Sequence, residues 1–530
     1  MLRKIRLTLA IVFWVLITWL LVDFTGTAHA YLGWMAKIQF MPALLAVNVG
    51  VLFFLVALTL LFGRIYCSVI CPLGVMQDAI AGLNRKKNKY SYSPEKGLLR
   101  ACFVLAAGVL LTVGLGWVAS LVFPYSTYGR IVGTVLAPLY KLGNNVLAGI
   151  AERHESYAFY TVDVWLKSLP ALIMALAAWI VIAVLAWRGG RTWCNTVCPV
   201  GTLLGMISRH SRLKVVMNAE ACKNCRKCER NCKSACIDLK NHTIDYSRCV
   251  VCGDCLEECR FDALSFGYQP MIDKENIIYN DWREKQEKKS EETKTDEDLK
   301  NPAIDEGRRA VLTSAALLVG TSLMKAQEKT TDGGFAIIED KKKPHREHQI
   351  TPPGSISVRH LREQCTACQL CIDSCPNDVL RPSTRLATFM QPEVSYERGY
   401  CRPECNRCSQ VCPTGAIQPI EVDVRKETQV GHAVWVESNC IPAKDGKPCG
   451  NCARHCPVQA IQLVPAGSKY HQDRGQWFDA DNKRVDGRLV PMIPVVNEEK
   501  CIGCGACEYV CPSRPFSAIY VEGHEVHKEV

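Results

Sequence analysis

The sequence predicts a multi-domain chain: an N-terminal bundle of four transmembrane helices, then a small α+β domain, then a larger C-terminal domain organised by repeated cysteine motifs. Three observations lead to this prediction. Hydrophobic residues make up 48% of the chain and concentrate in residues 1–190. The 30 cysteines far exceed ordinary usage, and most of them fall in compact groups of four. Strongly polar stretches separate the cysteine-rich regions, as linkers between domains do.

Four apolar stretches are long enough, or nearly so, to cross a bilayer. Each lacks charge in its middle, apart from Arg100 at the edge of the third. The first stretch also precedes Ala28-His29-Ala30, a small-residue pattern, so a cleaved signal peptide is the alternative reading there. The four stretches cover roughly residues 7–22, 41–62, 99–123 and 168–187.

The positive charges indicate the orientation of these helices. Arginine and lysine are dense in the loop 64–98 and follow the fourth stretch at Arg188 and Arg191, whereas the loop 23–40 carries only Lys37. Because positive residues mark the cytoplasmic side, the N-terminus, loop 64–98 and the chain just after residue 188 are expected there. The net charge of +11 therefore reflects membrane flanks rather than a nucleic-acid partner.

An internal repeat links two halves of the apolar region. Residues 64–74, RIYCSVICPLG, match residues 191–201, RTWCNTVCPVG, and each copy contains C-x3-C-P. An i, i+4 pair lies on one face of a helix, so two such pairs could form a tetrathiolate site, a redox-active disulfide, or simple packing at a helix end. The four cysteines of this possible redox or metal site are Cys67, Cys71, Cys194 and Cys198.

Two cysteine quartets follow, with the C-x2-C-x2-C-x3-C spacing of bacterial ferredoxins. Three thiolates on a tight loop hold one face of a [4Fe–4S] cubane, and the fourth ligates the neighbouring cluster. The spacing thus predicts two mixed sets. The first set is Cys222, Cys225, Cys228 and Cys259, and the second is Cys249, Cys252, Cys255 and Cys232.

Four more quartets lie near the C-terminus, and each ends in Cys-Pro. They are Cys365, Cys368, Cys371 and Cys375; Cys401, Cys405, Cys408 and Cys412; Cys440, Cys449, Cys452 and Cys456; Cys501, Cys504, Cys507 and Cys511. Sequential and nested exchange of fourth ligands both fit. Zinc is the alternative occupant, but it usually takes two separated cysteine knuckles. The spacing favours six [4Fe–4S] clusters held by 24 cysteines.

The remaining cysteines and segments complete the predicted organisation. Cys102 is expected to be a small apolar core residue, and Cys236 is spare or a substitute for Cys232. Arg308-Arg309 precedes a short apolar run that resembles a Tat export signal, with a buried or interfacial helix as the alternative. The predicted segments are 1–207 (transmembrane), 208–270 (dicluster ferredoxin-like), 271–307 (charged linker), 308–324 (Tat-like or anchoring), 325–355 (linker) and 356–530 (tetracluster polyferredoxin).

At this point the chain resembles a known family. Residues 1–270 resemble NapH, a membrane ferredoxin of periplasmic nitrate reductase systems, in their four membrane helices, two C-x3-C-P motifs and two quartets. Residues 305–520 resemble NapG, a Tat-exported protein with four [4Fe–4S] clusters. The resemblance implies a quinol dehydrogenase component that takes electrons from menaquinol or ubiquinol and passes them to a periplasmic cytochrome c or terminal reductase. It also implies a multi-pass protein of the inner membrane, with the dicluster domain cytoplasmic and the tetracluster domain periplasmic.

The sequence offers only weak candidates for a quinol site. His154 has a suitable unperturbed pKa for accepting a proton near neutral pH, and Glu152 and Glu155 flank it, although a solvated loop helix explains these residues better. Two other functions compete with quinol oxidation: a non-enzymatic assembly or redox-sensing factor for a metalloenzyme, and a membrane-anchored cytoplasmic polyferredoxin.

Overall fold

The structure is a computed structural model, and it describes most of the chain. The described residues are 2–84, 90–156, 158–219, 221–268, 331–332, 336–337, 341–466, 470–473, 476–479, 483–487 and 490–529. The charged linker 271–307 and the Tat-like segment 308–324, including Arg308-Arg309, lie outside them.

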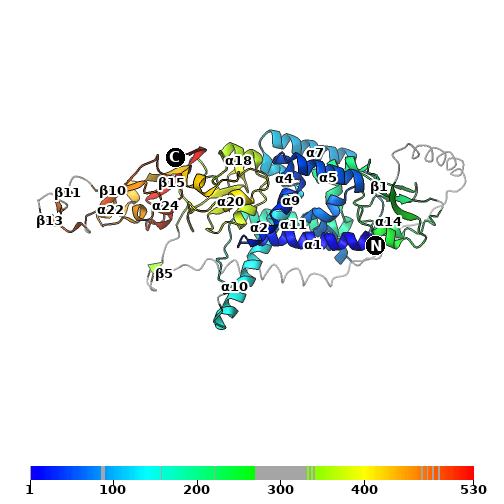
Figure 1. Cartoon of the computed structure of the whole chain (residues 1–530), viewed down its shortest axis with the longest axis horizontal. Coiled ribbons are helices and arrows are strands. Elements are labelled where there is room, and N and C mark those ends of the chain that lie inside the picture. The colour runs from blue at the N-terminus through cyan, green and yellow to red at the C-terminus, as the bar shows by residue number, and fades with distance from the viewer. Residues whose placement is uncertain are drawn as a thin grey trace.

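The molecule is elongated, with a helical domain in the middle and a cysteine-rich domain at each end (Figure 1). We call residues 2–208 the helical domain, residues 209–268 the small cysteine domain and residues 341–529 the large cysteine domain. Four helices run along the helical domain between the other two. They are α1 (Leu2–Val22), α5 (Val49–Phe62), α7 (Gly97–Thr112) and α11 (Leu169–Gly189).

Helices α1 and α11 each connect one cysteine domain with the other. Arg3, at the start of α1, pairs with Asp254 of the small domain, and the carbonyl of Phe24, just after α1, accepts a hydrogen bond from Arg407 of the large domain. Lys167, just before α11, pairs with Asp373 of the large domain, whereas Arg191, just after it, donates its backbone N–H to the carbonyl of Lys233 in the small domain.

Among the described residues, only α1 and α11, of 21 residues each, form helices long and apolar enough to cross a membrane. The second and third expected spans are shorter than the sequence predicted. The second is interrupted between α4 (Phe40–Leu45) and α5, where Val47 adopts a positive φ and the side chain of Asn48 caps α5. The third ends after α7, where Gly114 adopts a φ of 79° and turns the chain.

Further helices complete the helical domain, and all of them are short except α10, which has 17 residues and projects from the body of the molecule (Figure 1). The two repeat segments fold back into the domain, and the Cys-Pro prolines occupy the first position of α6 and α13, where a missing N–H is harmless. These helices are α2 (Thr27–Leu32), α3 (Trp34–Lys37), η1 (Tyr66–Ile70), α6 (Pro72–Leu83), α8 (Gly116–Ala119), α9 (Pro124–Ile131), η2 (Val132–Leu136), α10 (Ala137–Arg153), α12 (Thr192–Thr196) and α13 (Pro199–Ser208).

The small cysteine domain is an antiparallel α+β unit. Its outer strands pair from Leu213↔Tyr268 to Met217↔Leu264, and an inner hairpin pairs Ile237 with Ile244. Its elements are β1 (Leu213–Met217), α14 (Lys227–Asn231), β2 (Ile237–Asp238), β3 (Thr243–Ile244), α15 (Asp254–Glu258) and β4 (Leu264–Tyr268).

The large cysteine domain consists of short helices, two-stranded sheets and a three-stranded sheet in the order β11-β12-β13. Its longest strand pairing joins β9 with β15 from Thr428↔Glu529 to Trp435↔Ile519. Its main elements are α18 (Val358–Gln364), α19 (Leu370–Asp373), β7 (Leu380–Pro382), β8 (Pro392–Val394), α20 (Arg407–Val411), α21 (Val422–Glu427), β9 (Thr428–Trp435), α22 (Ile441–Asp445), α23 (Asn451–Arg454), β10 (Ile461–Pro465), β11 (Tyr470–Asp473), β12 (Gln476–Asp479), β13 (Arg484–Val485), β14 (Met492–Val496), α24 (Ala506–Val510) and β15 (Ile519–Glu529).

The predicted linker 325–355 needs a correction over its described part. Residues 341–355 belong to the large cysteine domain, because Ile350 is buried and Arg346 pairs with the buried Glu508. Arg346 also donates to the carbonyl of Val521, 2.7 Å away. The polar sequence suggested a solvated segment, but its charges pair with groups inside the domain.

Candidate functional site: the cysteine quartets

The cysteine loops share a backbone conformation that depends on the left-handed region. In each C-x2-C-x2-C loop, the residue before the second cysteine and the residue after it both have positive φ. These residues are Asn224 and Arg226, Val251 and Gly253, Ala367 and Gln369, and Gly503 and Gly505. Five of the eight are not glycine, although this conformation is uncommon for such residues. The fourth cysteine then follows a short helix in an extended conformation, as Cys232 follows α14.

The small domain gathers its cysteines in the two mixed sets expected from the spacing. One cavity is lined by Cys222, Cys225, Cys228 and Cys259. A second is lined by Cys232, Cys249, Cys252 and Cys255, together with Cys236. Burial raises the pKa of Cys228 to about 11, so metal binding must displace a proton from this thiol.

The large domain exchanges its fourth cysteines between neighbouring quartets, so the structure selects the sequential arrangement. A cavity is lined by Cys440, Cys449, Cys452 and Cys511, and Cys456 acts electrostatically on Cys501 and Cys504. Likewise Cys412 acts on Cys365, Cys368 and Cys371, and Cys375 acts on Cys408.

The four sets of the large domain lie in a defined order from the helical domain. Gly129 of α9 packs against the carbonyl of Cys368, which places the Cys365 set nearest the helices. Cys401 donates its backbone N–H to the carbonyl of Cys504 at 2.9 Å, so these two sets are neighbours. The Cys440 set lies beside α22, at the end of the molecule far from the helical domain (Figure 1).

Buried arginines without carboxylate partners test whether anionic clusters fit these sites. Among the described residues, three of the eight buried arginines make no ion pair, and all three lie beside cysteines: Arg64, Arg130 and Arg425. Arg425 Nη2 is 3.3 Å from Cys401 Sγ, and Arg130 acts electrostatically on Cys365 and Cys368. A buried charge normally requires a counter-charge, which clusters bound by four thiolates supply. The quartets therefore fit [4Fe–4S] clusters.

The C-x3-C-P cysteines also meet in one place. Cys67, Cys71, Cys194 and Cys198 are all buried, and Cys198 lies within electrostatic range of the other three. The repeat thus brings together residues that are more than 120 positions apart in the sequence. Within the described part of the chain, no three His, Cys, Asp or Glu side chains converge closely enough to hold a single metal ion.

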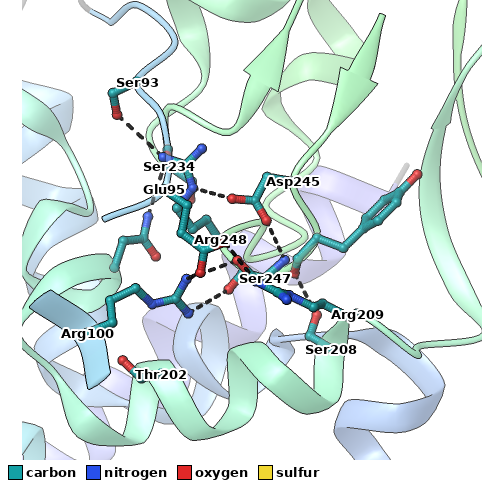
Figure 2. A network of polar contacts seen from close by, with 12 residues as sticks. Ser93, Glu95, Arg100, Thr202, Ser208, Arg209, Ser234, Asp245, Ser247 and Arg248 are labelled. Carbon is teal, nitrogen blue, oxygen red and sulfur yellow. Dashed lines mark hydrogen bonds and ion pairs between the residues drawn. The ribbon is translucent and has the colours of Figure 1, made fainter. Parts of the chain in front are cut away.

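A polar network joins this region to the small cysteine domain (Figure 2). Ser247 accepts hydrogen bonds from Arg100 at its side chain and from Arg64 at its carbonyl, at 3.0 and 2.9 Å. Glu95 pairs with Arg100 and Arg209. Because Ser247 lies two residues before Cys249, the network fixes the Cys249 loop against the helical domain.

The positions of the other residues that the sequence singled out give less support for a functional role. Glu152, His154 and Glu155 are exposed at the end of α10, which projects from the body of the molecule (Figure 1). Cys102 is exposed on α7, so its expected core role is wrong: the helix turns this face outward. Cys236 Sγ lies 3.5 Å from Cys232 Sγ, and its hydrogen bond lowers the pKa of Cys232 to about 7.

The sequence did not reveal that the arginines beside the cysteines and the tyrosines of α9 are buried. Tyr125 is fully buried beside the Cys365 set, and its hydroxyl has no hydrogen-bond partner among the described residues. Tyr128 bonds Thr18 of α1 at 2.6 Å. For Arg64 and Arg191 a signal existed, because both open the repeat motif. Arg425 lies 24 positions from Cys401, and no sequence pattern joins them.

Three family models match the chain. A 4Fe-4S binding domain model matches residues 44–90 and 171–218, a 4Fe-4S dicluster domain model matches residues 364–416 and 447–514, and a second 4Fe-4S binding domain model matches residues 242–265. These matches fall on all three domains. The chain is therefore an iron–sulfur protein with several 4Fe–4S binding regions.

Curated relatives agree with this assignment. The methylamine utilization ferredoxin-type protein MauM of Methylobacillus flagellatus is 32% identical over 171 residues, which cover 31% of this chain and 63% of the relative. The ferredoxin-type protein NapG of Escherichia coli is 29% identical over 31% of this chain and 66% of its own length, and NapF of the same organism is 26% identical over 33% and 87%. The chain thus spans about two thirds of MauM and NapG. No solved structure matches the fold.

Proposed function

We propose that the protein is a membrane-bound electron carrier that oxidises quinol and delivers electrons to a redox protein at the far end of the large cysteine domain. The observation that carries the proposal is the course of α1 and α11, which each run from one cysteine domain to the other. If these helices cross the membrane, the two cysteine domains lie on opposite sides. This arrangement disfavours a polyferredoxin whose domains are all cytoplasmic.

The surface of the helical domain supports a membrane location. Only 33% of the apolar window of α1 and 28% of that of α11 are buried, so most of each helix faces outward. Large apolar side chains such as Phe53 of α5 and Leu105 of α7 are exposed on the other long helices as well. A soluble monomer rarely exposes so much contiguous apolar surface. The cytoplasmic position of the small domain follows the positive charges around residues 64–98.

The position of α9 makes it the preferred place for quinol oxidation. It lies where the helical domain meets the Cys365 set, and it carries the buried Arg130 and Tyr125, whose hydroxyl has no hydrogen-bond partner in the part of the chain that the structure describes. A quinol releases two electrons and two protons, so its site must adjoin both an electron acceptor and a polar group. When bound, the clusters supply one-electron transfer. The exposed end of α10, which carries His154, does not adjoin an electron acceptor of this kind.

Reduction by a menaquinol analogue tests the proposal. The analogue is added anaerobically to the oxidised full-length protein in detergent, and cluster reduction is followed by absorbance and low-temperature EPR. We expect rapid reduction in the wild type, slower reduction in Tyr125→Phe, and no change in the matched variant Tyr160→Phe, whose ring is exposed. Intact clusters that no quinol analogue reduces would favour the assembly or redox-sensing function instead.

A further inference from the structure

We propose that Cys67, Cys71, Cys194 and Cys198 together bind one more iron–sulfur cluster, shared between the two halves of the internal repeat and additional to the six quartets. The proposal goes beyond quinol oxidation and does not depend on it.

The four thiols are supplied symmetrically by the two repeats. Cys67 lies in η1 and Cys194 in α12, whereas Cys71 and Cys198 are the residues immediately before α6 and α13. Their exposed fractions are 4%, 2%, 3% and 3% in that order. Each repeat therefore presents one thiol from a short helical turn and one from the start of the next helix. Four cysteine thiolates are the usual ligand set of both [2Fe–2S] and [4Fe–4S] clusters.

Reciprocal arginine contacts hold the two halves together. Arg64 Nη2 donates to the carbonyl of Cys194 at 3.2 Å, and Arg191 Nη1 donates to the carbonyl of Cys67. A Cβ at Gly74 would collide with the carbonyl of Cys67, and a Cβ at Gly201 would collide with that of Cys194. The same close packing on both sides indicates that the two motifs form one site rather than two separate helix ends.

The buried charge of Arg64 favours an anion at this site. Arg64 is fully buried, makes no ion pair among the described residues, and has Nη2 3.8 Å from Cys67 Sγ. Gln77 also directs its amide nitrogen toward Cys194 Sγ, 3.3 Å away. With neutral thiols or two disulfides, only the Cys249 set, on which Arg64 also acts electrostatically, would balance this buried charge. A cluster bound by four thiolates is anionic and balances it, as at Arg425.

The spacing of the thiols favours a cluster over a single ion. Zinc bonds sulfur at about 2.3 Å and draws its four ligands together, but no group in the described chain converges that closely. The cysteines of the six quartets do not converge that closely either, and the 4Fe–4S family models match these quartets in large part. The 4Fe-4S binding domain model that matches residues 44–90 and 171–218 covers all four cysteines of this site.

The site lies between the two groups of quartets. On one side, Arg64 donates to the carbonyl of Ser247, and Asn195 donates to the carbonyl of Ser234 at 3.2 Å, next to the Cys249 set. On the other side, α6 packs against α9, whose Gly129 contacts Cys368. A cluster here would bridge an otherwise long interval between the small and the large cysteine domain.

Iron analysis tests the proposal without reference to quinol. The full-length protein is purified anaerobically in detergent, and iron and acid-labile sulfide are measured per chain, with EPR and Mössbauer spectra. We expect about 28 irons in the wild type rather than about 24. The double variant Cys67→Ala/Cys194→Ala should lose about four irons and keep the spectra of the other clusters. Cys102→Ala, which removes an exposed cysteine of the same domain, should lose none.

Each outcome decides the matter. A loss of about two irons would also support the shared site, occupied by the smaller [2Fe–2S] type. A wild-type protein with about 24 irons, or a double variant with an unchanged iron content, would overturn the proposal. If the double variant does not accumulate, the wild-type total still decides. Failure of quinol to reduce the protein would leave these iron counts unaffected.

Discussion

Arg425 should raise the reduction potential of the cluster bound by Cys401, Cys405, Cys408 and Cys375. Its guanidinium is fully buried and lies 3.3 Å from Cys401 Sγ, with a second contact to the carbonyl of Thr428. Reduction adds one negative charge to a cluster, and a nearby fixed positive charge stabilises the reduced form. Removing this charge should therefore lower the potential.

The size of the effect follows from Coulomb's law. The added electron is spread over the cubane, so its mean distance from the guanidinium is about 7 Å, which gives about 2.4 kcal/mol at an effective dielectric constant near 20. At about 2.3 kcal/mol per 100 mV, this energy corresponds to about 100 mV. We expect Arg425→Met to lower the potential of this cluster by about that amount. Arg425→Lys keeps the positive charge, so the potential should fall only slightly.

A redox titration monitored by EPR measures the shift. Lys426→Met is the matched control, because Lys426 neighbours Arg425 on α21 but is exposed and paired with Asp423. Solvent screening should limit its effect to about 20 mV. An unchanged potential in Arg425→Met, or an equal fall in both variants, would refute the electrostatic role of the buried guanidinium.

Three further predictions concern other parts of the chain. Cys236 Sγ lies 3.5 Å from Cys232 Sγ, so Cys236 should replace Cys232 as a ligand in the variant Cys232→Ala. This variant should keep the iron of the Cys249 set with a changed EPR signal, whereas Cys232→Ala/Cys236→Ala should lose that iron. Loss of the iron in the single variant would contradict the prediction. Burial and the charge of Arg425 lower the pKa of His527 to about 4, so proton uptake by the unfolded chain should destabilise the large domain by up to about 3 kcal/mol as the pH falls from about 6.5 to about 4. His527→Gln should weaken this pH dependence in thermal melts, and parallel curves for both proteins would argue against it. Helix α10 exposes Leu139, Val146 and Ile150, so a nitroxide at position 146 in liposomes should report headgroup depth, whereas one at Glu152 should be fully accessible to a water-soluble relaxation agent.

The sequence was most informative where ligand spacing and helix length decide the structure. The C-x2-C-x2-C-x3-C pattern predicted the mixed sets of the small domain, since the fourth cysteine cannot reach the cluster held by its own loop. The lengths of α1 and α11 follow directly from uninterrupted apolar runs. Local chemistry shortened the other two predicted spans: Asn48 starts a new helix as its cap, and Gly114 turns the chain after α7.

Long-range contacts explain what spacing left open. Exchange of fourth cysteines in the large domain depends on which quartets pack together, and tertiary contacts decide it, as where Cys511 joins Cys440, Cys449 and Cys452 around one cavity. The ion pair of Arg346 with Glu508 joins residues 162 positions apart, so residues 341–355 read as a polar linker although they pack into the domain. The same holds for Arg425, whose proximity to Cys401 arises only from tertiary packing.

The order of the sites along the molecule constrains the function more than their number does. The Cys222 set, in which Cys225 is exposed, lies in the small domain. The Cys440 set lies near the opposite end of the molecule, beside α22. A redox sensor would need a single responsive centre, whereas a carrier needs accessible centres at both ends. If quinol oxidation at α9 were the only point of entry, the Cys222 set would lie off the route to the large domain. Its exposed position therefore favours a second redox partner on the side of the small domain. A variant that lacks the Cys222 set should not exchange electrons with this partner, whereas quinol should still reduce the large domain.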